Sequence, residues 1–115
     1  MEATAESFER DVIETSRERP VVVDFWAAWC RPCRALGPAI ESEVAKRAEA
    51  IRLVKVDVDA ESALAARYGI QSIPTVAVFA HGGPVTSFVG AQPAAAISRF
   101  LDVAIAEHAG PREAS

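Results

Sequence analysis

The sequence predicts an α/β fold in which a small mixed sheet carries helices on both of its faces. Two observations lead to this prediction. Strand and helix patterns alternate through the first part of the chain, which is typical of parallel strands joined by right-handed helical crossovers. Farther along, two strand patterns flank the turn residues His81, Gly82 and Gly83, which indicates a β-hairpin and adds an antiparallel part to the sheet.

Length and composition restrict the class of protein. The chain has 115 residues, so we expect a single domain over residues 1–115 with frayed ends at 1–6 and 109–115. Half of the residues are hydrophobic and 24% are charged, which favours a globular protein over a disordered one. The net charge of −4 argues against nucleic-acid and membrane partners. No signal peptide or apolar membrane-spanning run is visible, so we expect a cytoplasmic protein.

Three elements are expected in the first half of the chain. Apolar residues recur at helical spacing over residues 8–19, which predicts an amphipathic helix that ends before the following proline. Pro20–Trp26 is a nearly continuous run of β-branched and aromatic residues, typical of a strand buried on both faces. A second helix is expected from about Cys30 to Ala48, with a kink near Pro38.

The next segment predicts a second strand and a short helix. Ile51–Val58 has the apolar pattern of another interior strand. Asp59 is expected to cap the short helix that follows, and Gly69 to end it at the C′ position. The hairpin strands are Pro74–Ala80 and Val85–Val89.

A last helix is expected to begin at Pro93, since proline is favoured at the start of helices. Gly110 and Pro111 should end it. Its apolar stripe is expected to pack on the core and consists of Ile97, Phe100, Leu101, Ala104 and Ile105.

The two cysteines, Cys30 and Cys33, lie where the first predicted strand passes into a helix. The start of a helix offers unpaired N–H groups and a partial positive charge, which stabilise a thiolate at Cys30. A spacing of three residues brings the side chains within reach of a disulfide, and Pro32 presets a helical backbone angle. We therefore expect one exposed nucleophile and one recessed partner, as disulfide exchange requires.

A metal site and a pair of inert cysteines are the alternatives. Structural zinc needs about four ligands, and beyond the cysteines the chain has only His81 and His108 as nitrogen ligands, so we expect no metal. A bare Cys-x-x-Cys is a weak signal and would also fit two unrelated core cysteines. The strand-loop-helix context favours a redox function.

Over roughly residues 7–102 the chain resembles the thioredoxin family. The matching motifs are VVVDFWAAWCRPC, the GP of RALGPAI, VKVDVD, RYGIQSIPT, the hairpin at Phe79 and the Val89–Gly90 step. The resemblance implies the thioredoxin fold and a protein-disulfide reductase in which Cys30 attacks and Cys33 resolves. It also implies no bound cofactor, disulfide-containing protein substrates, and re-reduction by a thioredoxin reductase that uses NADPH. We expect a monomer.

Asp24 stands in the middle of an otherwise apolar strand, where an ionised carboxylate is costly. The resemblance implies that Asp24 is a buried proton acceptor for Cys33 with a raised pKa, and that Lys55 lies beside it and balances its charge. With the two cysteines, these are the candidate catalytic residues. An Asp24 that faces solvent on a strand bulge and a Lys55 that reaches into solvent at a sheet edge are the alternatives.

The resemblance further implies a cis peptide bond between Ile73 and Pro74 that lies against the cysteine pair. The main chain of Ile73 would then pair with an extended substrate segment. The implied substrate-binding residues are Trp29, Arg31, Pro32, Val58, Ser72, Ile73, Pro74, Val89, Gly90 and Ala91.

Two features depart from the family pattern. The usual first strand has only about Met1 to Thr4 left to form it, so this edge strand is expected to be short or missing. Arg31 stands where a typical member has glycine, which allows a specialised thiol-disulfide oxidoreductase or isomerase as an alternative function. A thioredoxin-fold adaptor without redox turnover is the non-enzymatic alternative.

Overall fold

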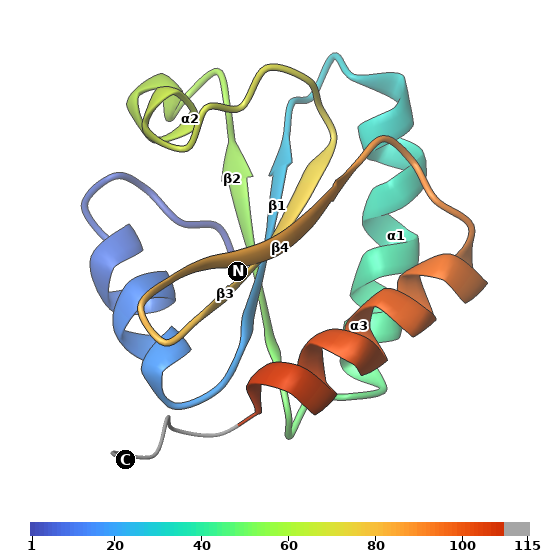
Figure 1. Cartoon of the computed structure of the whole chain (residues 1–115). Helices are drawn as coiled ribbons and strands as arrows, with labels where there is room; N and C mark the ends of the chain where they lie inside the picture. Colours follow the sequence, from blue (N-terminus) through green and yellow to red (C-terminus); the bar gives the residue numbers. More distant parts are fainter. Residues whose placement is uncertain (110–115) are drawn as a thin grey trace.

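A computed structural model describes residues 1–109, and within them the chain forms a four-stranded sheet in the order β2-β1-β3-β4 (Figure 1). The elements are η1 (Glu9–Glu14), η2 (Thr15–Arg17), β1 (Val21–Trp26), α1 (Arg31–Ala45), β2 (Arg52–Asp57), α2 (Ser62–Arg67), β3 (Thr75–Ala80), β4 (Gly83–Val89) and α3 (Ala94–His108). Strand β1 pairs in parallel with β2 and antiparallel with β3, and β3 forms a hairpin with β4. The predicted mixed sheet is confirmed.

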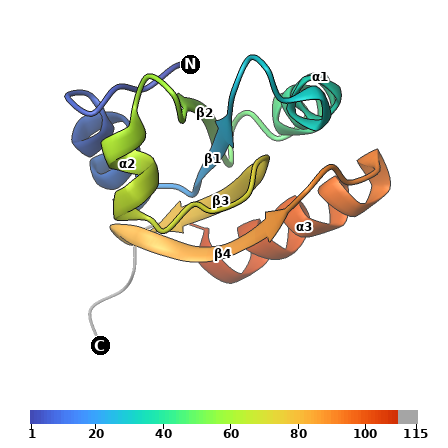
Figure 2. The same cartoon turned by 90° about the horizontal axis from the view of Figure 1, so that it is seen from above.

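Helices cover both faces of the sheet, with η1 and α2 on one side and α1 and α3 on the other (Figure 2). The alternation of strand side chains explains this arrangement. On β1, Val21, Val23 and Phe25 pack into the cluster that contains η1 and α2, whereas Val22 packs with α1 and α3. Strand β1 therefore supplies apolar side chains to both layers, as its sequence predicts.

The first helical segment forms where the apolar spacing predicts it. It runs through η1 in π geometry and through η2 in 3₁₀ geometry. Phe8, Val12 and Ile13 are buried in the core layer beneath it. The buried Pro20 then leads directly into β1.

Strand β2 lies beside β1 near the edge of the sheet, so the prediction of an interior strand is wrong. Within residues 1–109, its outer side is covered by one bridge, between Glu2 and Lys55. The N–H of Ala3 donates to the carbonyl oxygen of Lys55 at 2.9 Å. The N–H of Lys55 donates to the carbonyl oxygen of Met1 at 2.6 Å. The expected short edge strand is thus a single bridge, and the first residues, expected to fray, are bonded to β2.

The ends of two helices differ from the prediction. Helix α1 ends at Ala45 rather than near Ala48, because the chain turns there and carries Ile51 into the core. The helix runs on through Pro38, and the kink stays a prediction. Asp59 does not cap α2: the N-cap is Glu61, and the carboxylate of Asp59 accepts from an indole instead.

The hairpin and the last helix follow the prediction closely. His81 and Gly82 both adopt positive φ angles, 56° and 92°, as a tight turn between β3 and β4 requires. Gly69, at φ 66°, follows the C-cap of α2 as expected. Pro93 is the N-cap of α3, and the expected stop at Gly110 and Pro111 lies outside the described residues. Across residues 1–109 no helix combines the length and hydropathy needed to cross a bilayer.

Candidate active site

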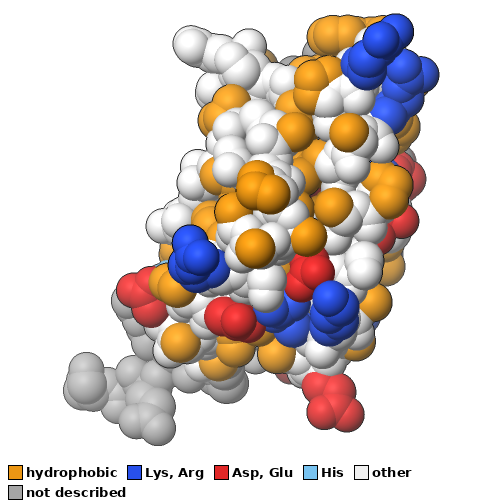
Figure 3. Space-filling view, turned by 90° about the vertical axis from the view of Figure 1, so that its right-hand side faces the viewer, with side chains coloured by type: hydrophobic (Ala, Val, Ile, Leu, Met, Phe, Trp, Pro, Cys, Tyr) orange, Lys and Arg blue, Asp and Glu red, His pale blue; other side chains and the backbone are white. Residues whose placement is uncertain are grey.

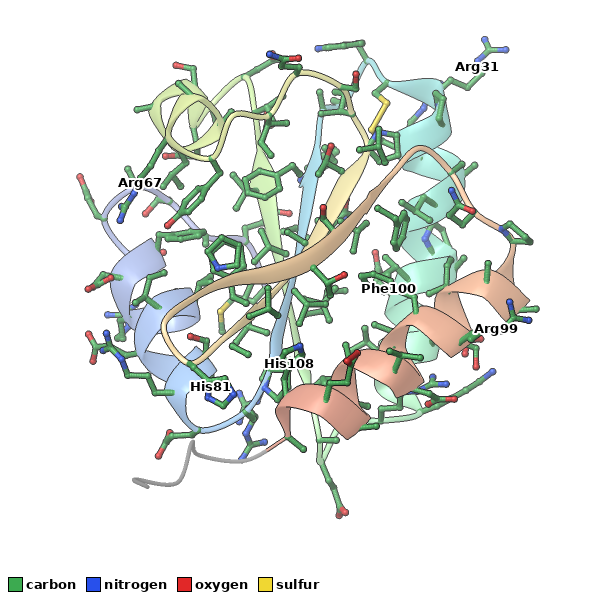
Figure 4. All side chains as sticks on the ribbon, in the orientation of Figure 1. Arg31, Arg67, His81, Arg99, Phe100 and His108 are labelled. Atoms are coloured by element: carbon green, nitrogen blue, oxygen red, sulfur yellow. A yellow bond between two sulfur atoms is a disulfide. The ribbon has the colours of Figure 1, made fainter. Side chains whose placement is uncertain are left out.

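Cys30 and Cys33 form a disulfide at the start of α1, with their Cα atoms 5.3 Å apart. Cys30 is the N-cap residue of α1, and its Sγ accepts a hydrogen bond from the N–H of Cys33 at 3.2 Å. Pro32 occupies the first turn, where a missing N–H leaves no bond unmade. Figure 4 shows the disulfide at the end of the molecule where Arg31 projects outward. The predicted strand-turn-helix setting is confirmed.

Both cysteines are almost completely covered in this disulfide form. Cys30 is 4% exposed and Cys33 is 3% exposed, so the prediction of an exposed Cys30 is wrong. The two pack with Ala27, and Val58 and Ile73 close over them from neighbouring loops. Only a small part of Cys30 is therefore accessible to a substrate in this form.

Trp29, next to Cys30, is the large apolar side chain that faces solvent here, at 68% exposed. Its indole Nε1 donates to the carboxylate of Asp59 at 2.7 Å. This hydrogen bond holds the indole over the loop that follows β2. An exposed, fixed aromatic ring beside the disulfide is suited to contact with a protein partner.

Asp24 is buried on β1, at 1% exposed, and its Oδ1 has no hydrogen-bond partner among the described residues. It shares a face of β1 with Trp26, which packs against the cysteine cluster. Burial raises the pKa of Asp24 from 3.8 to about 6, because the charged form loses its hydration. The alternative of a solvent-facing Asp24 is wrong.

Lys55 is the registered neighbour of Asp24 across the β1–β2 pair. Its positive charge lowers the pKa of Asp24, whereas the nearby carboxylates of Glu2 and Glu41 raise it. The Lys55 side chain is only 22% exposed: its Nζ lies 3.3 Å from Glu41 Oε2 and 4.9 Å from the centre of the Trp26 ring. The alternative of a Lys55 that reaches into solvent is therefore wrong.

Glu41 and Gly37 belong to this charge cluster, and the sequence interpretation missed both. They follow Cys33 at intervals of four residues and so share its face of α1. A Cβ on Gly37 would lie 3.6 Å from Lys55 Nζ and 3.7 Å from Glu41 Oε2, at ordinary van der Waals contact, so Gly37 lies directly beside this ion pair. The helical spacing was a usable signal. No sequence signal indicated that Glu2 lies near Asp24, because its position depends on a bridge to Lys55, which is distant in the chain.

The loop before β3 packs against the two cysteines. The Ile73–Pro74 peptide bond is cis, as the resemblance implies, and Ile73 packs against the two cysteines. The N–H of Gly90 donates to the carbonyl oxygen of Pro74 at 2.8 Å, which ties the end of β4 to this loop. Gly90 has φ 89°, a conformation that residues with a Cβ rarely adopt.

Three of the other implied substrate-binding residues lie in two separate places. Val58 lies at the disulfide, whereas Ser72 and Val89 border a hollow of about 520 Å³ between the α2–β3 loop and β4. Val89 and Ala91 are exposed. The cysteines do not line this hollow.

The histidines lie closer together than their places in the sequence suggest. The rings of His81, in the hairpin turn, and His108, in the last turn of α3, have centroids 6.1 Å apart (Figure 4). Among residues 1–109, no three or more His, Cys, Asp or Glu side chains gather as a metal site would need.

Comparison with known proteins agrees with the geometry. The family model for thioredoxin matches residues 1–103. The chain is 45% identical to the thioredoxin of Streptomyces clavuligerus over 96 residues, which is 84% of this chain and 87% of the relative. It is 42% identical to the thioredoxin of Mycolicibacterium smegmatis over 104 residues, 89% of this chain and 91% of the relative. It is also 39% identical to thioredoxin 1 of Synechococcus elongatus over 99 residues, which is 86% of this chain and 91% of the relative.

The raised pKa of Asp24 predicts how stability depends on pH. As pH rises from about 4 to about 6, the unfolded chain loses this proton before the folded protein does, so the free energy of unfolding falls and stays lower above that window. Asp24→Asn removes the charge, and we expect it to stabilise the oxidised protein by about 3 kcal/mol at about pH 8 and hardly at all near pH 4. Urea unfolding at both pH values measures this. An equal effect at the two would contradict it.

The charge of Lys55 predicts a second shift. Because Lys55 lowers the pKa of Asp24, Lys55→Met should raise that pKa further, as followed by NMR titration of the Asp24 carboxyl carbon. Lys46→Met is the matched control, since Lys46 pairs with Glu43 instead, and it should leave the titration unchanged. A Lys55→Met titration that coincides with wild type would show that the two charges do not interact.

Proposed function

Since the chain belongs to the thioredoxin family and is a protein-disulfide reductase with an active-site disulfide at Cys30 and Cys33, we propose that Cys30 attacks the substrate and Cys33 completes the exchange. The observation that carries this assignment is the hydrogen bond from the Cys33 N–H to Cys30 Sγ at the N-cap of α1. In the reduced protein the same N–H and the helix start stabilise a thiolate on Cys30 rather than on Cys33.

The reaction then runs in two thiol-disulfide exchanges. The Cys30 thiolate bonds to one sulfur of the substrate disulfide, and the other substrate sulfur leaves as a thiolate and takes up a proton. Cys33 then loses its proton and attacks Cys30 Sγ, which breaks the mixed disulfide and frees the second substrate thiol. Two electrons pass to the substrate, and the Cys30–Cys33 disulfide forms.

Asp24 is the proposed acceptor of the Cys33 proton. It lies on the same face of β1 as Trp26, which packs against the cysteine cluster, and within residues 1–109 its Oδ1 has no hydrogen-bond donor. With a pKa of about 6 it is ionised at neutral pH, yet takes a proton far more readily than an exposed carboxylate does. Lys55 positions and balances this charge through its own pairing with Glu41.

The substrate is proposed to lie across the opening between Trp29 and the cis-proline loop. Within residues 1–109 the N–H and carbonyl oxygen of Ile73 form no backbone hydrogen bond, so both are free to pair with an extended segment. Val58, which packs against the cysteine cluster, is a proposed wall of this site, and so are Pro74 and Gly90, which are hydrogen-bonded to each other. The other proposed contacts are Arg31, Pro32, Ser72, Val89 and Ala91.

Electrons are proposed to come from a thioredoxin reductase that uses NADPH, with disulfide-containing proteins as substrates and the cytoplasm as the location. The sequence has no glycine-rich nucleotide-binding signature of its own. A partner must therefore re-reduce the Cys30–Cys33 disulfide after each cycle.

Turnover with NADPH, a bacterial thioredoxin reductase and insulin tests the proposal. We expect wild type to reduce insulin with consumption of NADPH. Cys30→Ser should abolish the reaction, because it removes the nucleophile. Cys33→Ser should instead accumulate a covalent protein–substrate disulfide, visible by mass spectrometry, because resolution fails. An inactive wild type, or activity that survives in Cys30→Ser, would refute the assignment.

Arg31 has a limited predicted effect on the reduction potential. Its cation stabilises the Cys30 thiolate and so favours the dithiol, but an exposed charge interaction contributes less than about 1 kcal/mol. Arg31→Gly should therefore make the potential more negative by on the order of 20 mV, as measured by equilibration with glutathione, while Arg31→Lys should leave it nearly unchanged. A shift of roughly 100 mV would favour the specialised-oxidant alternative.

A further inference from the structure

The charges around the disulfide are distributed unevenly. Two arginines lie on one side, on the first turns of α1: Arg31 at the first position and Arg34 three residues later, both exposed. Figure 3 shows a cluster of Lys or Arg side chains at the upper end of this side of the molecule, the end at which Figure 4 labels Arg31. The loops before β3 and after β4, residues 68–74 and 90–93, contain no charged residue.

Three acidic residues lie on the other side, Asp57 at the end of β2 and Asp59 and Glu61 after it, but each is already hydrogen-bonded within the protein. Asp57 Oδ1 accepts the N–H groups of two residues of its own loop. Asp59 accepts the Trp29 indole at 2.7 Å, and Glu61 Oε1 accepts the N–H of Ala5 at 2.8 Å. Neither Arg31 nor Arg34 donates a side-chain hydrogen bond or forms an ion pair with any residue in 1–109. The three carboxylates keep their negative charge, because their donors are neutral, but they are already engaged. Arg31 and Arg34 are the charged side chains next to the disulfide that have no partner within residues 1–109.

The two arginines also stand against a local preference. The start of a helix carries a partial positive charge, which disfavours cations and favours acidic residues, yet the first turn of α1 contains no acidic residue. Departures from local rules are expected where function requires them. In a chain of net charge −4, this cationic group lies directly beside the reactive sulfur.

From these observations we infer that the protein prefers substrate disulfides that lie in acidic segments. The acidic side chains of the substrate pair with Arg31 and Arg34 while its main chain lies along Ile73. The inference rests on the proposed reductase function and names the substrate class of that same site.

Two peptides of equal length test the preference. Each carries one cysteine as a mixed disulfide with 5-thio-2-nitrobenzoate, flanked by aspartates in one peptide and by lysines in the other. Cys30 bonds to the peptide sulfur and releases the coloured thiolate, and Cys33 then frees the peptide thiol. The rate with each peptide, at low ionic strength, is divided by its rate with uncharged 2-mercaptoethanol, which removes the intrinsic reactivity of the peptide.

We expect wild type to reduce the aspartate peptide about threefold to fivefold faster than the lysine peptide, the range of an exposed ion pair. Arg31→Gln combined with Arg34→Gln should bring this ratio close to one, and so should high salt, which screens exposed charges. The ratio cancels any change in the Cys30 thiolate that affects both peptides alike. Arg67→Gln combined with Arg99→Gln, at two exposed arginines on α2 and α3 (Figure 4), changes the net charge equally and should keep the preference.

Equal normalised rates of the wild type with the two peptides overturn this inference but leave the proposed reductase function standing. A preference that survives in the Arg31→Gln and Arg34→Gln variant, or that is lost equally in the Arg67→Gln and Arg99→Gln control, overturns it as well, since net charge or another surface would then be responsible. Failure of both peptides to react faster with wild type than with Cys30→Ser overturns the proposed function and this inference with it.

Discussion

The hydrogen bond from the N–H of Cys33 to Cys30 Sγ is the interaction on which the site depends. It forms because β1, apolar on both faces, is fixed between the two core layers and ends at Trp26. The chain then has room for one tight turn, closed by the bond from the N–H of Cys30 to the carbonyl oxygen of Ala27 at 3.1 Å. The core thereby determines which cysteine becomes the N-cap residue of α1, and the helix start determines which sulfur carries the charge.

The polar groups of the site oppose the preferences of the elements that carry them. Asp24 interrupts an apolar strand, and its charge is costly where it lies. Arg31 and Arg34 place cations at a helix start. The apolar packing on both faces of β1 stabilises the strand despite the carboxylate. Lys55, on the adjacent strand, offsets part of the cost of its charge. Stability is thus given up at the positions that surround the disulfide.

Local patterns were sufficient for the elements that hold the disulfide. The apolar run of β1, the helix start at Cys30 and the glycine turn of the hairpin are each encoded within a few neighbouring residues. The edge position of β2 was not predictable, because an edge strand with one covered side has nearly the same pattern as an interior strand. The resemblance placed the Ile73–Pro74 peptide against the cysteine pair, but the near-complete burial of Cys30 was missed, since it depends on how closely loops from distant parts of the chain pack on the sulfur. Glu41 could have been found from its helical spacing to Cys33.

The central claim is that the start of α1 stabilises a thiolate on Cys30. The pH dependence of the alkylation of Cys30 by iodoacetamide in the reduced protein, followed by mass spectrometry, tests it most directly. The account predicts a Cys30 pKa at least about one unit below the roughly 8.5 of a free cysteine. A Cys30 pKa at or above about 8.5 would contradict it, because the cap and the helix start would then have no effect on the charge of the sulfur.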